Sequence, residues 1–155
     1  MPYHVEIQTL TPQPIAVVRR TAKVADLSRV VPEACGEVWN FVRRENIAAG
    51  RHVAVYHDDA IHCDIGVELT GGLEVNGPFT GDGTVHYSTL PEGDAATTAH
   101  FGPYHLLSGA HEAIHQWCNA CGLTMIRPCW EVYGHWTNDP TQIRTDVYYS
   151  LARKS

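Results

Sequence analysis

Two stretches of the chain repeat apolar residues at steps of three and four, the spacing of an amphipathic helix with one buried face. In the first stretch, Pro32 stands at a place suited to a first helical turn, and in the second, Gly122 stands at a place suited to a helix end. We therefore predict two helices. Their apolar positions are Val31, Ala34, Cys35, Val38, Phe41 and Val42 in the first, and Leu107, Ala110, Ile114, Trp117, Cys118 and Cys121 in the second.

Each predicted helix is preceded by one run of strand-like residues and followed by two such runs with alternating apolar positions. This order predicts a βαββ unit that occurs twice. Two further strands are expected at 6–10 and 84–90, and the turn-rich residues 71–83 are expected to connect the halves. The strands of the units are expected at 15–20, 52–59 and 61–69 in the first half, and at 94–101, 129–136 and 143–151 in the second.

The two halves also superpose residue by residue, which indicates an internal duplication. Val38 falls on Ile114 at an offset of 76 residues, Tyr56 falls on Tyr133 at 77, and Asp64 falls on Asp146 at 82. We predict one α+β domain over residues 1–155, with repeats at about 5–70 and 84–153 related by pseudo-twofold symmetry. Its antiparallel sheet is expected to have the two helices on one face and a ligand cleft on the other.

Strand alternation predicts which polar side chains lie on the face that the helices leave uncovered. If the apolar set of each strand faces the helices, the other face collects carboxylates and aromatic rings. A flat organic cation is recognised by such groups, through stacking and charge pairing, although a solvated sheet face has a similar composition. The residues expected on this face are Tyr56, Asp64, Glu68, Glu131, Tyr133, Asp146 and Tyr148.

Charge and composition exclude several classes of function. Eleven basic and seventeen acidic side chains give a formal net charge of -6, so we expect no direct contact with nucleic acid, and the two repeats leave no segment for a helix-turn-helix.

No apolar run approaches the ~20 residues that cross a bilayer, and the first residues do not resemble a signal peptide, so we expect a cytoplasmic protein without membrane contact. The five cysteines lie in apolar segments, which favours free thiols over disulfides.

A metal site on the second helix was considered, because His111 and His115 are four residues apart and Cys118 and Cys121 follow on the same flank. The two cysteines, however, belong to the apolar stripe of that helix. Four ligands along one helix also cannot close a tetrahedron around a metal ion. We therefore predict neither a metal site nor a cofactor.

Several short segments, in this order along the chain, resemble the GyrI-like small-molecule-binding family. In the second half they are LPEGD (90–94), HFGPY (100–104), the helix with Trp117, EVYGH (131–135) and TDVYYSL (145–151), and in the first half Trp39 and VYHDD (55–59). The family includes effector-binding domains of multidrug-responsive transcription regulators and stand-alone relatives. Because no DNA-binding segment is expected, gene regulation by this chain would need another protein.

The resemblance implies that Glu131 lies in a ligand cleft and pairs with cationic, hydrophobic ligands. It places Tyr148 at an aromatic position of the family, and Asp146 where a longer glutamate is more usual. Tyr56 and Tyr133, at equivalent positions of the two repeats, are expected to line the cleft, and Trp39 to edge it.

Three functions stay open at this point. The first is binding of hydrophobic, cationic or planar aromatic small molecules. The second, also implied by the resemblance, is a hydrolase that opens the cyclopropane ring of alkylating natural products, with Glu131 as general base and Tyr133 or Tyr56 polarising the substrate. The third is an inhibitor that binds a protein partner, as the gyrase inhibitor of the family does. Binding and hydrolysis would use the same side chains, so the sequence does not separate them.

Overall fold

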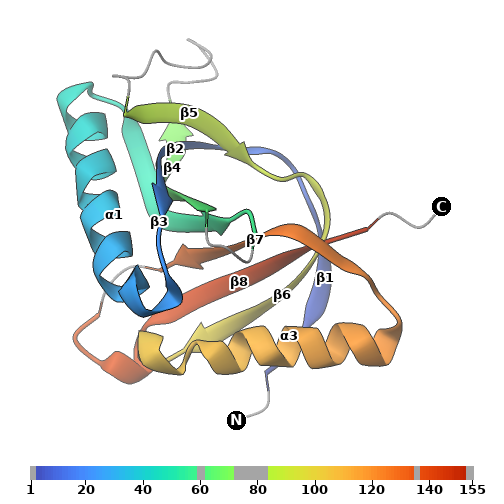
Figure 1. Cartoon of the computed structure of the whole chain (residues 1–155). Helices are drawn as coiled ribbons and strands as arrows, with labels where there is room; N and C mark the ends of the chain where they lie inside the picture. Colours follow the sequence, from blue (N-terminus) through green and yellow to red (C-terminus); the bar gives the residue numbers. More distant parts are fainter. Residues whose placement is uncertain (1–2, 59–61, 72–83, 135–136, 153–155) are drawn as a thin grey trace. The chain divides into compact units, whose positions relative to one another are not determined.

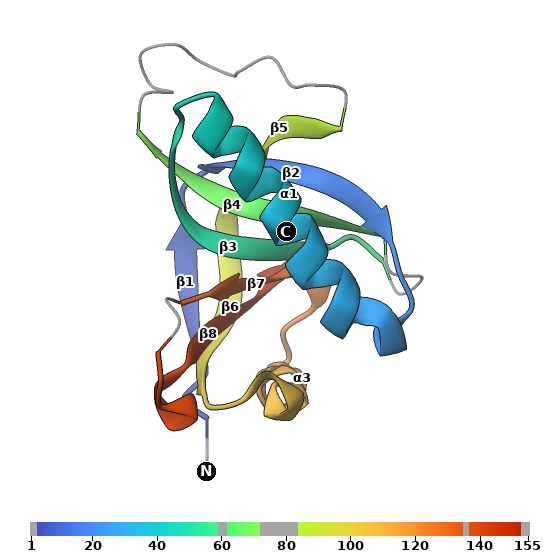
Figure 2. The same cartoon turned by 90° about the vertical axis from the view of Figure 1, so that its left-hand side faces the viewer.

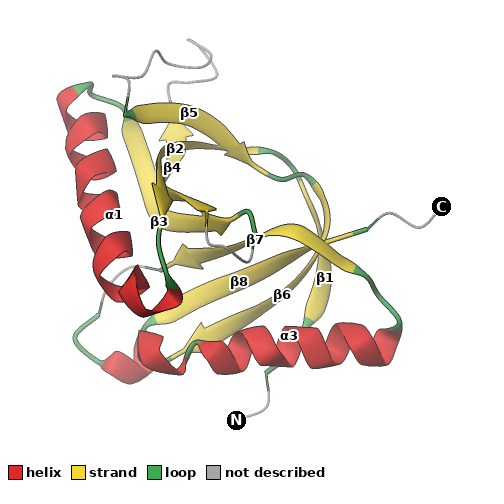
Figure 3. Ribbon diagram, in the orientation of Figure 1, coloured by secondary structure: helices red, strands yellow, loops and turns green. Residues whose placement is uncertain are grey.

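The structure is a computed structural model that describes residues 3–58, 62–71, 84–134 and 137–152. The chain forms two compact units. The first unit is Pro12–Leu90, and the second unit combines Met1–Thr11 with Pro91–Ser155. Figure 3 shows the helices and strands of both units. Within the described ranges, no helix is long and apolar enough to cross a membrane.

The first unit is a four-stranded antiparallel sheet packed against one helix, α1 (Leu27–Arg44). Figure 2 shows α1 crossing in front of the sheet. The helix contacts three strands and buries Ala34, Val38, Phe41 and Val42, as its apolar stripe predicts. In sheet order the strands are β3 (Ala48–Tyr56), β4 (His62–Gly71), β2 (Gln13–Thr21) and β5 (Val85–Leu90).

The second unit repeats this plan with the helix α3 (Ser108–Cys121), which packs on β6 and β8 (Figure 1). The helix buries Ala110, Ile114 and Cys118, and it ends as predicted at Gly122, whose φ of 70° is the left-handed conformation of a helix C-terminus. In sheet order the strands are β1 (Glu6–Leu10), β6 (Gly93–Phe101), β8 (Arg144–Leu151) and β7 (Met125–Tyr133).

The strand registers support the duplication. Tyr56 pairs with Cys63 in the first unit, and Tyr133 pairs with Thr145 in the second, which are the positions that the offsets of 77 and 82 predict. Each unit also has a register shift near the start of the corresponding strand, before His52 in β3 and before Cys129 in β7. The predicted α+β class is confirmed, and the described residues form antiparallel strands and two α-helices.

Two details differ from the prediction, and one was not tested. The strand β1 pairs with β6 of the second unit, and β5 pairs with β2 of the first, so the compact units do not coincide with the sequence repeats. The helix α1 begins at Leu27, so Pro32 lies inside it rather than in its first turn. Most of the turn-rich connection, residues 72–83, lies outside the described residues.

Candidate functional site

In the second unit, the side chains of α3 identify the face of the sheet on which Glu131 lies. His111 of α3 lies within hydrogen-bond distance of both Glu131 and Tyr149. Since side chains alternate along a strand, Tyr133 points to the same side as Glu131. Tyr148 instead stacks on Trp130, with ring centroids 5.2 Å apart, on the opposite face.

In the first unit, Tyr56 lies on the face that α1 covers. Trp39 of α1 contacts His52, with ring centroids 5.8 Å apart, and Tyr56 follows His52 by two steps of strand alternation. Asp64 and Glu68 point the other way, because they alternate with Cys63 and Val67, the cross-strand partners of Tyr56 and His52.

The expectation that all seven polar residues share the uncovered face was therefore wrong. Glu131 and Tyr133 lie on the α3 face of their sheet, and Tyr56 lies on the α1 face of its sheet, whereas Asp146 and Tyr148 lie opposite α3. The reason is that both faces of each sheet are buried. The side chains pointing away from the helices include Val17, Val53, Val55, Trp130 and Val132, none more than 4% exposed.

Four side chains on the α3 face form a hydrogen-bonded group that we call the Glu131 cluster: Glu131, Tyr133, His111 and Tyr149. The hydroxyl of Tyr133 donates to Glu131 Oε1 at 2.5 Å, and His111 Nε2 lies 2.6 Å from Glu131 Oε2. Glu131 is only 6% exposed. A buried carboxylate requires such partners, because an unpaired charge would be strongly destabilising away from water.

The Tyr149 hydroxyl connects the cluster to further titratable groups. It lies 2.7 Å from His111 Nδ1 and 3.3 Å from His115 Nε2. Burial raises the pKa of the Tyr149 phenol, so this hydroxyl keeps its proton at neutral pH. Burial likewise raises the pKa of the neighbouring Cys129 thiol, to which Arg127 Nη1 donates at 2.9 Å.

The first repeat has no such cluster at the equivalent positions. The counterparts of Glu131, His111 and Tyr149, at offsets of 77, 76 and 82, are Ala54, Cys35 and Val67. Ala54 and Val67 are both 0% exposed, so this place in the first unit is packed with apolar groups. The cluster is therefore not required by the fold, since the other copy of the same fold is formed without it.

Sequence reasoning missed two members of the cluster. His111 was considered only as a metal ligand, and Tyr149 was counted in the apolar set of its strand. Comparing the repeats position by position would have found both, because His111 and Tyr149 stand where the first repeat has Cys35 and Val67. A polar side chain in place of an apolar one indicates a local role beyond packing. Among the described residues, no group of three metal-ligating side chains lies close enough together to hold an ion.

Two of the predicted site residues, Asp146 and Tyr148, line a separate hollow of about 600 Å³ in the second unit. Thr97 also lines it. Asp146 is 7% exposed and accepts a hydrogen bond from Arg144 Nε at 2.9 Å, while the guanidinium of Arg144 lies over the ring of Phe101. Asp146 and Tyr148 point away from α3, so they do not join the Glu131 cluster.

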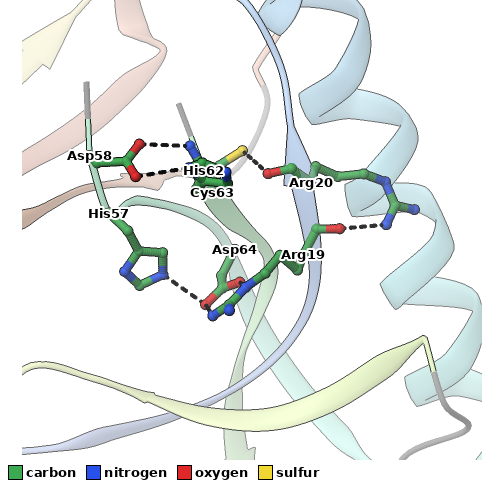
Figure 4. A network of polar contacts seen from close by, with 7 residues as sticks. All are labelled: Arg19, Arg20, His57, Asp58, His62, Cys63 and Asp64. Carbon is green, nitrogen blue, oxygen red and sulfur yellow. Dashed lines mark hydrogen bonds and ion pairs between the residues drawn. The ribbon is translucent and has the colours of Figure 1, made fainter. Parts of the chain in front are cut away.

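Figure 4 shows a network of polar contacts in the first unit that includes Asp64. Asp64, 3% exposed, accepts from Arg19 Nε at 3.0 Å and from His57 Nε2 at 2.8 Å. Burial acts to raise the pKa of Asp64, but the hydrogen bonds and charges of Arg19 and His57 outweigh it, and the pKa lies below its ordinary value. A permanent cation therefore already neutralises this carboxylate, which indicates a structural role.

Two further aromatic residues are partly exposed. Tyr104 packs edge-to-face on Tyr133, with centroids 5.8 Å apart, and is 48% exposed. Trp39, on α1 in the first unit, is 38% exposed. Exposed aromatic rings beside a buried carboxylate are the surface that a hydrophobic cation prefers, and Tyr104 with Tyr133 supplies such a surface next to Glu131.

Comparisons with solved structures show where this fold occurs. The chain is similar to the crystal structure of the EcmrR C-terminal domain, with a TM-score of 0.81 and 16% identity over 99% of this chain and 100% of that one. It is also similar to SAV2435 bound to tetraphenylphosphonium (TM-score 0.64, 11% identity, 98% and 94% covered). A hydrolase from Listeria innocua matches with a TM-score of 0.60 and 11% identity, covering 98% and 94%. At such identities these likenesses show the fold alone.

A comparison with proteins of curated function gives no match. The model of the family described as GyrI-like small molecule binding domain, however, matches residues 3–152, which span both units. This match agrees with the resemblance seen in the sequence and with the architecture of the two units. The chain therefore belongs to the GyrI-like small-molecule-binding domain family.

Proposed function

We propose that this protein binds hydrophobic cations, including planar aromatic ones, at the Glu131 cluster. The observation on which the proposal rests is the 6% exposed Glu131 carboxylate, bonded to a phenol and an imidazole and placed beside the Tyr133 and Tyr104 rings. A carboxylate held this way attracts a cation strongly, because little water screens it. The aromatic rings add cation–π and apolar contacts.

Three arguments support Glu131 as the ligand-binding acid rather than Asp64 or Asp146. Both aspartates are already paired with arginines, whereas the groups on Glu131 can yield to a ligand: a phenol is neutral, and an imidazole can lose its charge. The first repeat shows that the fold does not need the carboxylate. Finally, the family is one of small-molecule binding, and its relative SAV2435 was solved with tetraphenylphosphonium, a hydrophobic cation.

The other predicted ligand residues take different places in the proposal. Tyr133 belongs to the proposed site. Tyr56 and Trp39 lie in the first unit, and their ligand contacts stay a prediction from the sequence. Asp146 and Tyr148 could touch only a ligand on the far face of their sheet, so we leave them out of the Glu131 site. One family model spans both units, which supports treating 1–155 as one binding domain.

A second candidate function is hydrolysis, which would use the same carboxylate. A carboxylate 2.6 Å from an imidazole and 2.5 Å from a phenol resembles a general acid–base group, and such groups typically contribute ~10²–10⁴-fold to a rate. In that case Glu131 would activate water while Tyr133 polarises the substrate. The inhibitor function, with a protein partner, stays a prediction.

One titration tests binding and hydrolysis together. We would add tetraphenylphosphonium and, as a neutral molecule of similar shape, triphenylphosphine oxide, and measure binding by calorimetry. We expect saturable binding of the cation and much weaker binding of the neutral molecule. In parallel, a cyclopropane-containing alkylator would be followed by mass spectrometry, and ring opening that disappears in Glu131→Gln would identify a hydrolase. Equal affinity for the cation and the neutral molecule would contradict a site built on Glu131.

A further inference from the structure

His111 occupies the position on Glu131 that a bound cation would need. Its Nε2 lies 2.6 Å from Glu131 Oε2, a distance typical of a charge-assisted hydrogen bond. The side chain of Glu131 is 8% exposed and that of His111 is 23% exposed, so the imidazole is the more accessible partner of this pair. The other oxygen, Oε1, is held by Tyr133 and does not depend on His111.

We infer that His111 is an internal counter-cation of Glu131, that a cationic ligand displaces it with release of a proton, and that the affinity for a permanent cation therefore rises with pH. This inference rests on the proposed function, because it concerns the same site. It adds that pH regulates this site. It also names the ligand class, which is cations that stay charged at a pH where the imidazole is neutral.

The hydrogen bonds around His111 accommodate both protonation states. When the imidazole is neutral, Nε2–H donates to Glu131, and the Tyr149 hydroxyl donates to Nδ1. When the imidazole is protonated, Nδ1–H donates to the Tyr149 oxygen, and the Tyr149 hydrogen turns to His115 Nε2 at 3.3 Å. No buried polar atom has to lose its partner on the change, so neither state is excluded by an unsatisfied group.

In the described part of the chain, titratable and charged groups lie around His111 on its own helix and on the strands packed against that helix. Strand β6 carries His100, whose ring contacts the Tyr3 hydroxyl and the Pro103 carbonyl. Strand β7 contributes Glu131 and Cys129, with Arg127 and Tyr133 beside them. Strand β8 contributes Tyr149, and α3 itself contributes His115. Burial raises the pKa of both Cys129 and Tyr149, so neither titrates between pH 5 and 8, and arginine stays charged.

His115 is the second histidine of α3 that contacts Tyr149. Burial lowers its pKa, and the positive charges of His111 and Arg127 lower it further. It contacts Tyr149 rather than Glu131, so it does not compete with a ligand for the carboxylate. This makes His115 the natural control for His111, one helical turn away on the same helix.

The comparison of the two repeats supports a specific role for this pair. At the positions of His111 and Glu131, the first repeat has Cys35 and Ala54, which form no ion pair. The histidine and the glutamate therefore occur together in one repeat and are both missing from the other. A histidine needed only for packing of the helix would not have to accompany the acid.

The sign of the pH dependence follows from proton linkage. At low pH the protonated His111 neutralises Glu131, and the ligand must expel a proton to bind. As the pH rises, imidazoles lose their proton, and the carboxylate becomes available without that cost. Release of one proton per ligand corresponds to a change in affinity of about tenfold per pH unit at most.

The test is the binding of tetraphenylphosphonium, which has no titratable group, measured by calorimetry from pH 5 to pH 8. At each pH two buffers of different ionisation enthalpy count the protons released. We expect the wild-type affinity to fall as the pH is lowered and up to one proton to be released at the acid end. We expect His111→Gln, which keeps an N–H group for Glu131, to lose both effects. We expect His115→Gln to keep both, because its amide oxygen can still accept the hydrogen of Tyr149.

The outcomes separate the two proposals. Wild-type binding without proton release or pH dependence overturns the inference and leaves the proposed function standing, and this result requires no variant to fold. The same conclusion follows if His111→Gln keeps the wild-type pH dependence, or if only His115→Gln abolishes it. Absence of binding at every pH overturns the proposed function and the inference with it.

Discussion

Buried carboxylates in this protein differ in what neutralises them. Asp64 and Asp146, both less than one-tenth exposed, accept hydrogen bonds from Arg19 and Arg144, whose charge is permanent. Glu131, buried to the same degree, is bonded by His111 and Tyr133. The arginine pairs suit a fixed structural role, whereas the bonds of Glu131 suit a carboxylate that exchanges partners when a ligand enters.

For Asp64 we predict a pH-dependent contribution to stability. Because the pKa of this carboxyl is lowered on folding, its stabilising effect is fully present above the ordinary pKa of about 4 and is lost as the pH falls through the folded-state value. Asp64→Asn should lower the free energy of unfolding by about 1–3 kcal/mol at pH 7. Urea denaturation at pH 7 and pH 3 measures this, and the difference between the variant and wild type should shrink at pH 3. An equal difference at both pH values would show that charge is not the cause.

The family resemblance predicted one residue of the Glu131 cluster that local periodicity alone would not have identified. The acid of the EVYGH segment was predicted as the ligand anchor, and its burial and hydrogen bonds are consistent with that role. His111 and Tyr149 were missed, because each lies on or beside an apolar stripe and the partner of a buried polar group comes from another element. Hydrogen bonds across 20 and 38 residues of sequence cannot be read from local periodicity.

The helices give the sharpest predictions for single elements, through two glycines with open space around them. Gly122 ends α3 at a φ of 70°, where an L-residue is strained, while Gly36 lies within α1, and a Cβ at either position would meet no atom within 4 Å. Gly122→Ala should therefore destabilise the protein by about 1–2 kcal/mol through backbone strain alone. Gly36→Ala should stabilise it by about 0.5–1 kcal/mol through helix propensity.

Thermal or urea denaturation of the two glycine variants checks this pair, with each serving as the control for the other. The contacts made by the added methyl group are negligible in both, so only the backbone conformation differs. Shifts of the same sign in the two variants would contradict the assignment of Gly122 to the helix terminus.

Element positions were predicted well, but the faces of two strands were not. Helical spacing and strand alternation are local patterns, and both helices and the predicted strands were found where the patterns indicated. Assigning the faces of β7 required deciding whether Trp130 or Glu131 points toward α3. The apolar side chains of a strand identify its helix-covered face only when the other face is solvated. Trp130 is 2% exposed on the face opposite α3, so that assumption failed.

The molecule is two copies of one βαββ plan. The second copy has the Glu131 cluster beneath its helix, where the first has Ala54, Cys35 and Val67. The duplication was visible in the sequence as near-constant offsets, because each copy must pack a helix on a sheet in the same register. The sequence did not show that β1, at the start of the first repeat, pairs with β6 of the second unit, or that β5, at the start of the second repeat, pairs with β2 of the first unit. Strand pairing between distant segments leaves no local pattern.

The net charge leads to a prediction about the whole chain. With a formal charge of -6, the isolated protein should not bind duplex DNA, because affinity for a phosphate backbone requires clustered positive charge. An electrophoretic mobility assay at low salt measures this, and we expect no shift at micromolar protein. A salt-sensitive shift at nanomolar protein would contradict the prediction.

The central claim is that Glu131 is the anionic group of a cation-binding site, and one comparison of affinities tests it most directly. Calorimetric titration with tetraphenylphosphonium would be carried out on the wild type, Glu131→Gln and Asp146→Asn. Both variants remove one buried negative charge from the second unit, but only the first removes it from the α3 face. We predict that Glu131→Gln weakens binding by about 1–3 kcal/mol and that Asp146→Asn leaves the affinity within about twofold of the wild type. Equal binding by the wild type and Glu131→Gln, or equal weakening in both variants, would contradict the claim.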